Sequence, residues 1–220
     1  MTKQLSFIFL IVSIPLVTLA QQGEKAGKIL DKLARKNKSY ETIQADFSVT
    51  YTNLQAKDQS NTSDGKIIMK GDKYKLKLNK STIYYNGKTQ WNHLHDVSEV
   101  NISEPVQDKS EQDIINHPNK IFELYTRDFK YKYLEKTSEN NQTYDVIDLY
   151  PKNLEKDYSR IRLKINAEEP QIHSAKLFGK DGSRFTITIE NMEVNKEIPD
   201  STFVFKEEEH PDVEVIDMRF

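Results

Sequence analysis

Apolar and polar side chains alternate with a period of two along most of the chain from residue 43 onward. In the first such segment Phe47, Val49 and Tyr51 alternate with serine and threonine. Because successive side chains of a strand point to opposite faces, this pattern predicts strands with one buried and one wet face. The same period recurs in residues 65–69, 74–78, 90–94, 97–103, 129–133, 144–150, 161–165, 172–178, 185–189 and 203–205, which predicts about ten strands in all.

Short turn signals separate these strands. Asn86 and Gly87 form the dipeptide most typical of a two-residue hairpin, Gly71 and Asp72 form another, and residues 180–182 read Lys-Asp-Gly. Strands joined by short turns, without helices between them, predict a consecutive antiparallel meander. No linker and no repeat period interrupts the pattern, so we expect a single domain over residues 21–220.

Two segments follow a helical pattern instead. In residues 26–40 an apolar stripe of Ile29, Leu30 and Leu33 runs along an otherwise charged helix. Residues 108–126 predict two short helices, with Pro118 in the first turn of the second. A sheet of this length must curl, and its concave apolar face needs a cover, which these helices can supply. The fold class is therefore mainly β (α+β), and the pattern leaves open whether the curled sheet packs solid or encloses a cavity.

The first twenty residues have the layout of a secretory signal peptide. Lys3 supplies a positive charge, residues 5–19 are almost wholly apolar, and Ala20 is a small residue at the expected cleavage site. The alternative is a membrane anchor, but the apolar run is shorter than the roughly 20 residues that span a bilayer. We therefore expect residues 1–20 to be cleaved and residues 21–220 to be exported to the periplasm in soluble form.

Composition removes several classes of function. The chain has no cysteine, which excludes disulfides and thiolate chemistry, and 32 basic residues nearly balance 34 acidic ones. Such a balance argues against nucleic acid as a partner and favours a monomer. No phosphate-binding loop or catalytic motif is present, so we expect no enzyme activity, cofactor or metal. A hydrolase of an unfamiliar class stays open as a weaker alternative.

His93 and His95 are the one local group that suggests a metal. Two positions apart, they share one face of a strand, and Asp96 follows directly. A polar strand edge is the simpler interpretation, because too few further ligands lie close in sequence. We therefore expect these histidines to be exposed to solvent.

Six segments together resemble the LolA-like family of periplasmic outer-membrane lipoprotein carriers. The most specific is the hairpin at residues 85–91, Tyr-Asn-Gly-Lys-Thr-Gln-Trp. The others are residues 29–33, 40–47, 70–74, 198–205 and 213–217. The resemblance covers essentially the whole mature chain and implies an incomplete, strongly curved antiparallel half-barrel whose concave face is covered by helices.

The resemblance also implies a function. Carriers of this family shield the acyl chains of lipoproteins, receive them from an inner-membrane ABC-type complex and deliver them to the outer membrane. For this chain the concave face would be lined by Phe47, Val49, Tyr51, Ile67, Met69, Tyr74, Leu76, Leu78 and Trp91. The lid would comprise Ile114, Ile115, Ile121, Phe122, Leu124 and Tyr125. For each of these residues the alternative is plain core packing.

Other members of this fold carry other lipids or pigment precursors, or act as envelope sensors, and these stay open as alternative functions. One departure from the family bears on the lid. Well-studied members have an arginine early in the third-strand region that latches the lid, whereas this chain has Lys70 there. An ammonium lacks the guanidinium fork, so either the latch or the cargo differs.

Overall fold

The computed structural model describes residues 17–55, 60–104 and 128–219, which form one long helix, twelve strands and two short 3-10 helices. The helix α1 spans Val17–Lys38. The first six strands are β1 (Thr42–Asn53), β2 (Ser60–Lys70), β3 (Lys73–Leu78), β4 (Ser81–Tyr85), β5 (Gln90–Leu94) and β6 (Glu99–Ser103). The others are β7 (Phe129–Glu139), β8 (Gln142–Pro151), β9 (Tyr158–Asn166), β10 (Ile172–Gly179), β11 (Ser183–Val194) and β12 (Glu214–Asp217).

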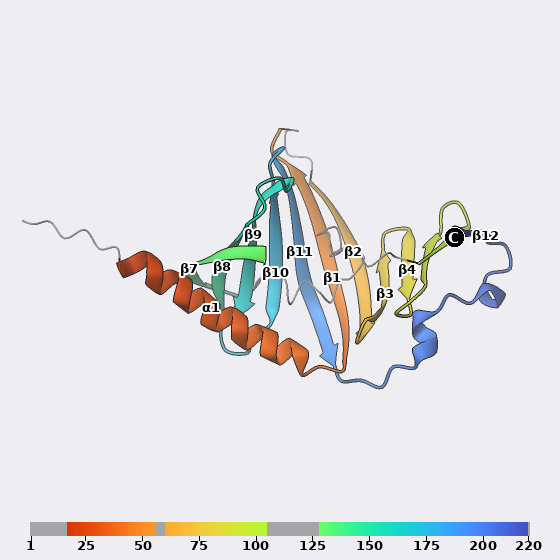
Figure 1. Cartoon of the computed structure of the whole chain (residues 1–220), viewed down its shortest axis with the longest axis horizontal. Helices are drawn as coiled ribbons and strands as arrows, with labels where there is room; N and C mark the ends of the chain where they lie inside the picture. The colour runs from red at the N-terminus through yellow and green to blue at the C-terminus, as the bar shows by residue number, and fades with distance from the viewer. Residues whose placement is uncertain (1–16, 56–59, 105–127, 220) are drawn as a thin grey trace, which may run out of the picture.

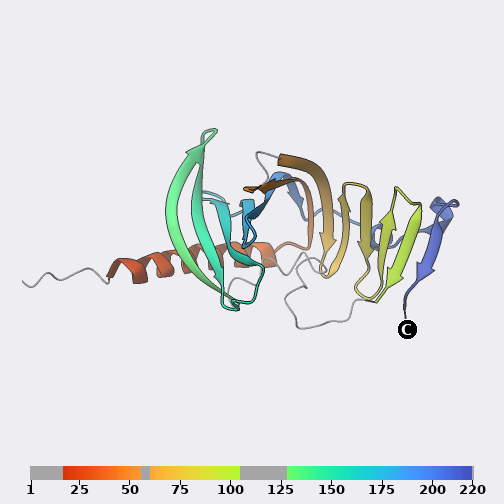
Figure 2. The ribbon, with the colours of Figure 1, turned by 90° about the horizontal axis from the view of Figure 1, so that it is seen from above.

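All twelve strands belong to one open, curled sheet, which confirms the expected half-barrel (Figures 1 and 2). Their order is β12-β6-β5-β4-β3-β2-β1-β11-β10-β9-β8-β7. The prediction of one consecutive meander is wrong, because there are two meanders, joined where β1 pairs with β11 from Ile43–Val194 to Asn53–Ser183. Alternation shows which residues form strands but not which distant strands pair, so this junction is invisible in the sequence.

The helix α1 packs on the sheet through one apolar stripe. Ala26, Leu30 and Leu33 are fully buried or nearly so and contact the cluster that contains Ile147 and Leu163. We call the face of the sheet that α1 covers the inner face, and the opposite face the outer face. The helix begins nine residues before the expected start and ends two residues before the expected end, because residues 17–25 contain no proline to stop it.

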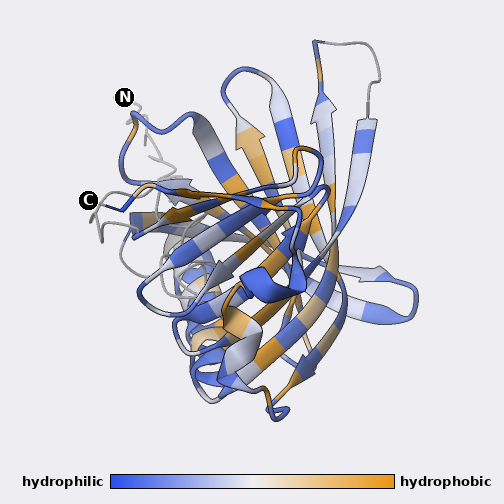
Figure 3. Cartoon of the chain, turned by 90° about the vertical axis from the view of Figure 1, so that its right-hand side faces the viewer, coloured by the Kyte–Doolittle hydropathy of each residue, from blue (hydrophilic) through white to orange (hydrophobic). Residues whose placement is uncertain are grey.

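A second buried cluster lies on the inner face beyond the reach of α1. It contains Ile43, Met69, Tyr74 and Tyr85, and the two tyrosine rings lie 5.4 Å apart. The pairing register places both clusters on the same face of the sheet. From β9 to β1, Leu163 pairs with Ala175, Ala175 with Ile187, and Ile187 with Val49. From β2 to β4, Ile67 pairs with Leu76, and Leu76 with Ile83. Hydrophobic and hydrophilic residues alternate along these strands (Figure 3). Apolar side chains therefore occur on the inner face of every strand from β8 to β4, interrupted by Asp145 on β8 and by Asn61 and Ser63 on β2.

Gly65 leaves room for the ring of Phe47, its partner in the β1–β2 register. A Cβ at Gly65 would lie 2.4 Å from the Phe47 ring, which is itself buried. We expect Gly65→Ala to lower the free energy of unfolding by about 1–2 kcal/mol, because the ring must shift within a packed face. Urea denaturation would measure this, and Gly65→Ala combined with Phe47→Leu should recover part of the loss; no recovery would contradict the assigned contact.

The C-terminal segment, residues 198–217, runs along the sheet and ends as its edge strand. A 3-10 helix, η2 (Asp200–Phe203), stands where a strand over residues 203–205 was expected, so that prediction is wrong. Lys70 and Lys73 donate to the Asp200 carboxylate at 2.9 and 2.5 Å, and these bonds lower its pKa to about 2. Lys70 therefore fastens the C-terminal segment.

The segment continues through a second 3-10 helix, η3 (Glu207–Glu209), into β12, which pairs with β6 in parallel. The sequence pattern predicted neither β12 nor β4. β12 has only four residues, too few to display a period, and β4 has five residues enclosed between two turns.

The outer face carries a buried ion pair between neighbouring strands. Asp148 on β8 is 2% exposed and accepts two hydrogen bonds from the Arg162 guanidinium on β9, at 2.7 and 2.9 Å. Arg160 Nε lies 3.4 Å from the same carboxylate. Both arginines also lie over the Phe178 ring on β10, at 3.9 Å for Arg160 and 5.6 Å for Arg162. The carboxylate thus holds two guanidiniums in place above an aromatic ring.

Candidate functional site

The inner face between the two buried clusters is apolar but incompletely covered. Here Tyr51 pairs with Phe185 and Val49 with Ile187, and the rings of Tyr51 and Phe185 lie 4.9 Å apart. Phe185 is 42% exposed and Ile187 is 36% exposed. Large apolar side chains usually leave water when a neighbour can cover them, so this strip of β1 and β11 is a candidate contact surface for an apolar ligand.

A cavity of about 520 Å³ extends the apolar surface at β3, β4 and β5. Its apolar lining consists of Leu76, Leu78, Ile83, Leu94 and Val97. At its rim Lys80 and Asp96 form an ion pair of 2.5 Å, which marks a polar border. The volume lies within the range of roughly 300–1,000 Å³ that small-molecule sites occupy.

The expected lining residues do not all share one environment. Phe47, Met69 and Tyr74 are buried, whereas Val49, Tyr51, Ile67, Leu76 and Leu78 are half-buried on the inner face. Trp91 was expected beside them, but register places it on the outer face, because Trp91 pairs with Tyr84 and Tyr84 with Lys75. The six expected lid residues lie outside the described residues.

Sequence reasoning overlooked part of this surface. Phe185 and Ile187 belong to a predicted strand but were not assigned to the concave face, and Ile83 and Leu94 were likewise left out. The alternation contained the signal for the first two. The alternation does not identify the strand that pairs with β11. That partner decides whether the apolar face of β11 joins the cavity or another core.

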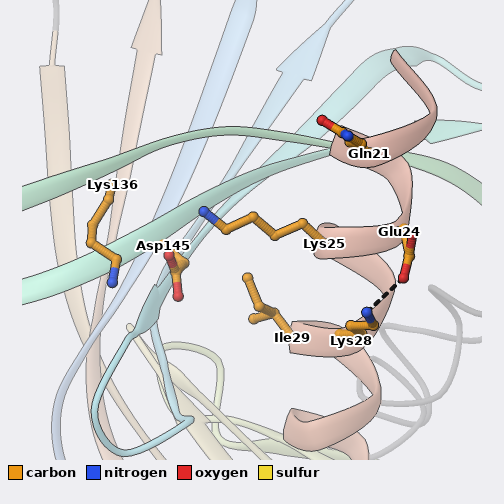
Figure 4. Close-up of a pocket in the computed structure, with 7 residues that line it drawn as sticks. All are labelled: Gln21, Glu24, Lys25, Lys28, Ile29, Lys136 and Asp145. Atoms are coloured by element: carbon orange, nitrogen blue, oxygen red, sulfur yellow. Dashed lines mark hydrogen bonds and ion pairs between the residues drawn. The ribbon is translucent and has the colours of Figure 1, made fainter. Parts of the chain in front are cut away.

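A charged pocket of about 370 Å³ lies at the other end of the inner face, between α1 and the β7–β8 hairpin (Figure 4). Asp145 is buried there and accepts a hydrogen bond of 3.1 Å from the Tyr133 hydroxyl. Lys25 extends from α1 toward Asp145, and its ammonium lies 3.5 Å from the Tyr133 ring centroid. The remaining lining residues are Gln21, Glu24, Lys28, Ile29 and Lys136. The apolar face therefore ends in a polar boundary at this side too.

His93 on β5 is the buried centre of an aromatic cluster on the outer face, and His95 lies directly after the strand. The His93 ring is 4.1 Å from His95, 4.8 Å from His210 and 5.3 Å from Phe205. His95 is exposed, as expected, and its Nε2 lies 2.9 Å from the Thr82 hydroxyl. For His93 the expectation of a wet strand edge is wrong, since it is only 4% exposed beneath the C-terminal segment.

Burial lowers the pKa of His93, and the neighbouring His95 and His210 lower it further. The ring is thus held neutral under conditions in which a free histidine starts to gain a proton. Within the described ranges, no three histidine or carboxylate side chains are grouped so that they could hold a metal ion.

Across residues 17–55, 60–104 and 128–219, no helix combines the length and apolar character needed to cross a bilayer.

Solved structures with a similar fold come from several bacteria. An uncharacterized conserved protein from Thermus thermophilus superposes with a TM-score of 0.56 at 11% identity, covering 88% of this chain and 99% of that one.

Two further structures match less closely. LprF from Mycobacterium bovis gives a TM-score of 0.49 at 13% identity over 80% of this chain and 96% of its own. A LolA superfamily protein from Nitrosomonas europaea gives 0.42 at 15% identity over 82% and 97%. At these identities the likeness concerns the fold alone. No curated protein matches the sequence.

The sequence itself identifies the family. Residues 16–168 match the family described as outer membrane lipoprotein carrier protein LolA. The matched region runs from α1 to β9 and so includes the hairpin at residues 85–91, β1, and both sides of the cavity. The chain belongs to the LolA-like family of outer membrane lipoprotein carrier proteins.

Proposed function

We propose that this protein is a periplasmic carrier that shields the acyl chains of lipoproteins, or of a related lipid, on its inner face. The observation that supports it best is the partly exposed apolar strip of Tyr51, Phe185 and Ile187 on β1 and β11, together with the apolar cavity at β3, β4 and β5 of the same face. Burying one methylene is worth about 0.8 kcal/mol, so acyl chains cross water only when an apolar surface covers them. A curled apolar sheet provides such a surface without any catalytic group.

The family suggests the partners. We propose that cargo arrives from an inner-membrane ABC-type lipoprotein-releasing complex and leaves for an outer-membrane acceptor, with residues 1–20 cleaved on export. The protein would act as a monomer and as a binding protein. The polar borders at Lys80–Asp96 and at Asp145 support an acyl-binding surface of limited extent, because charged rims fix where an apolar chain can lie.

Native mass spectrometry of the protein purified from its own periplasm tests the proposal directly. We expect extra mass that dissociates as a lipid or an acylated lipopeptide, and its composition would identify the cargo. To cover loss of cargo during purification, the same protein would be incubated with a fluorescent fatty acid and with an acylated lipopeptide. Absence of binding in all three measurements would contradict the carrier function and favour the sensor alternative.

Variants locate the binding surface. Ile187→Glu and Leu76→Glu should each weaken lipopeptide binding by at least about tenfold, because cargo would have to bury a carboxylate. Thr186→Glu and Lys77→Glu place the same group on the outer face next to each site and should bind like the wild type. Fluorescence titration measures the affinity, and circular dichroism checks that each variant is folded. Equal loss in inner-face and outer-face variants would contradict this assignment.

A further inference from the structure

Two leucines on loop tips are the most exposed large apolar side chains in the part of the chain that the structure describes. Leu154, in the β8–β9 loop, is 81% exposed, and Leu54, directly after β1, is 71% exposed. Single exposed leucines are common on protein surfaces. Two that project from neighbouring loops are a different matter, because together they form an apolar contact point.

Hydrogen bonds bring these loops to the same end of the sheet. The Leu54 amide donates to the Gly182 carbonyl in the β10–β11 turn at 3.3 Å. On the other side of that turn, the Lys180 ammonium donates to the Leu154 carbonyl at 2.5 Å, and the Lys180 amide donates to the Asp157 carbonyl at 2.8 Å. Figure 1 shows the end of β1, the β8–β9 loop and the β10–β11 turn at the upper end of the sheet. We call residues 54–55, 152–157 and 180–182 the loop rim.

Positive charge gathers at the loop rim, although the whole chain carries a net charge of −2. Residues 150–160 and 176–184, together with Asp128, whose carbonyl accepts from the Lys152 amide at 2.9 Å, contain six basic and four acidic side chains. The basic ones are Lys152, Lys156, Arg160, Lys176, Lys180 and Arg184, and the acidic ones are Asp128, Glu155, Asp157 and Asp181. Arg160, Arg184 and Lys176 lie over the Phe178 ring at 3.9, 4.9 and 5.6 Å, so their charges are held close together on the outer side of the rim.

The loop rim is continuous with the candidate cargo surface. Tyr51 lies three residues before Leu54 on β1, and Phe185 lies three residues after Gly182 on β11. Both belong to the partly exposed strip of the inner face. An apolar ligand on that strip would therefore reach the end of the sheet at which the two leucines project.

From these observations we infer that the loop rim docks on the surface of a membrane that contains anionic phospholipids. Leu54 and Leu154 would enter the boundary between head groups and acyl chains, while the basic side chains contact the phosphates. A bilayer accepts leucines from separate loops and cations between them without a fixed complementary shape. An acidic protein surface would satisfy the charges but would leave the two leucine tips without a defined pocket.

Vesicle co-sedimentation tests the inference. Cargo-free protein is mixed with vesicles of phosphatidylcholine containing phosphatidylglycerol, or of phosphatidylcholine alone. We expect binding to the anionic vesicles that weakens as salt is added, and a loss of about tenfold or more in the Leu54→Ser/Leu154→Ser double variant. Met218→Ser, which removes a 46% exposed apolar side chain near the C-terminus, should bind like the wild type.

Three outcomes would overturn the inference: wild-type protein that ignores anionic vesicles, a double variant that binds as well as the wild type, or a Met218→Ser variant that loses as much. Binding to immobilised polyglutamate without binding to vesicles would identify the loop rim as a surface for an acidic protein instead.

This inference extends the proposed carrier function, yet it can fail separately. Ile187→Glu should lose lipopeptide binding but keep vesicle binding, since Ile187 lies on the inner face and not on the loop rim. The double leucine variant should do the reverse, keeping lipopeptide binding in solution. A protein that binds vesicles but no lipopeptide would refute the carrier function and leave the docking surface standing.

Discussion

An Arg162→Met variant is expected to lose about 3 kcal/mol of unfolding free energy, which corresponds to more than a hundredfold shift toward the unfolded state. The substitution keeps the aliphatic part of the side chain but removes the bidentate partner of Asp148, which is 2% exposed. A buried carboxylate that is left without a close cation destabilises the folded state by more than the intact ion pair stabilises it. Arg160, at 3.4 Å, offsets only part of the loss.

Urea denaturation followed by circular dichroism measures this effect. Arg219→Met is the matched control, since Arg219 makes the same bidentate contact with Asp217 at the exposed C-terminus. Exposed pairs of this kind contribute less than about 1 kcal/mol. If both variants lost the same stability, burial of Asp148 would not be the cause.

Acidification from about pH 8 to about pH 5 should destabilise the protein through its neutral, buried His93, by at most about 2 kcal/mol, because the unfolded chain binds this proton with the ordinary histidine pKa. The pKa of His93 is lowered in the folded state, so the unfolded chain binds the proton first. The stabilising contribution is therefore complete above the ordinary histidine pKa of 6.5 and is lost progressively as the pH falls below it. Positive charge on the neighbouring His95 and His210 would repel a protonated His93.

Charged groups of other elements also face this cluster. They are Lys75 on β3 and Lys206 and Glu209 around η3, and Glu209 is held by Lys206 at 2.6 Å. The Tyr84 hydroxyl on β4 also lies there and stays neutral, since burial raises its pKa. Because the Lys206 ammonium already neutralises Glu209, little negative charge remains to favour His93 protonation. The C-terminal segment covers His93, so we expect its edge strand to detach first as the pH falls.

Hydrogen exchange of the β12 amides at several pH values measures this detachment. His93→Phe should make the protection factors of these amides, which are the exchange rates corrected for their intrinsic pH dependence, insensitive to pH, since it keeps an aromatic ring beside Phe205 and removes the titration. Burial also lowers the pKa of His173 on β10, whose ring stacks on Tyr144. This histidine lies far from β12 in the sheet. His173→Phe should therefore change overall acid stability but leave β12 exchange as in the wild type. An unchanged pH response of β12 in His93→Phe would refute the assignment.

The sequence predicts strands well where one face of the sheet is exposed to solvent. The alternation around Phe47, Tyr74 and Phe185 is confirmed, because each of these strands has an apolar inner face and a polar outer face. It fails where the C-terminal segment covers the outer face, since His93 is buried there despite its polar character. Burial by a distant segment leaves no local signature in the residues that it covers.

The face of the sheet on which each expected lining residue lies was predicted in part, for a related reason. Eight of the nine expected lining residues lie on the inner face, and Trp91 does not. Neighbouring residues of a strand point to opposite faces, so a one-residue error in assigning the face of β5 moves Trp91 from the cavity to the exterior. Hydropathy cannot correct this error, because Trp91 and Leu94 are both apolar yet lie on opposite faces.

The pairing of β1 with β11 also constrains how the chain can acquire its structure. Ile43 and Val194 are about 150 residues apart in sequence yet adjacent in the sheet. Such distant contacts delay folding, because the entropy of closing a long loop is lost before the contact forms. During synthesis the first meander must wait with one edge of β1 unpaired until β11 emerges. The sheet is therefore completed only after nearly the whole chain has been made, which suits the export across a membrane that we propose.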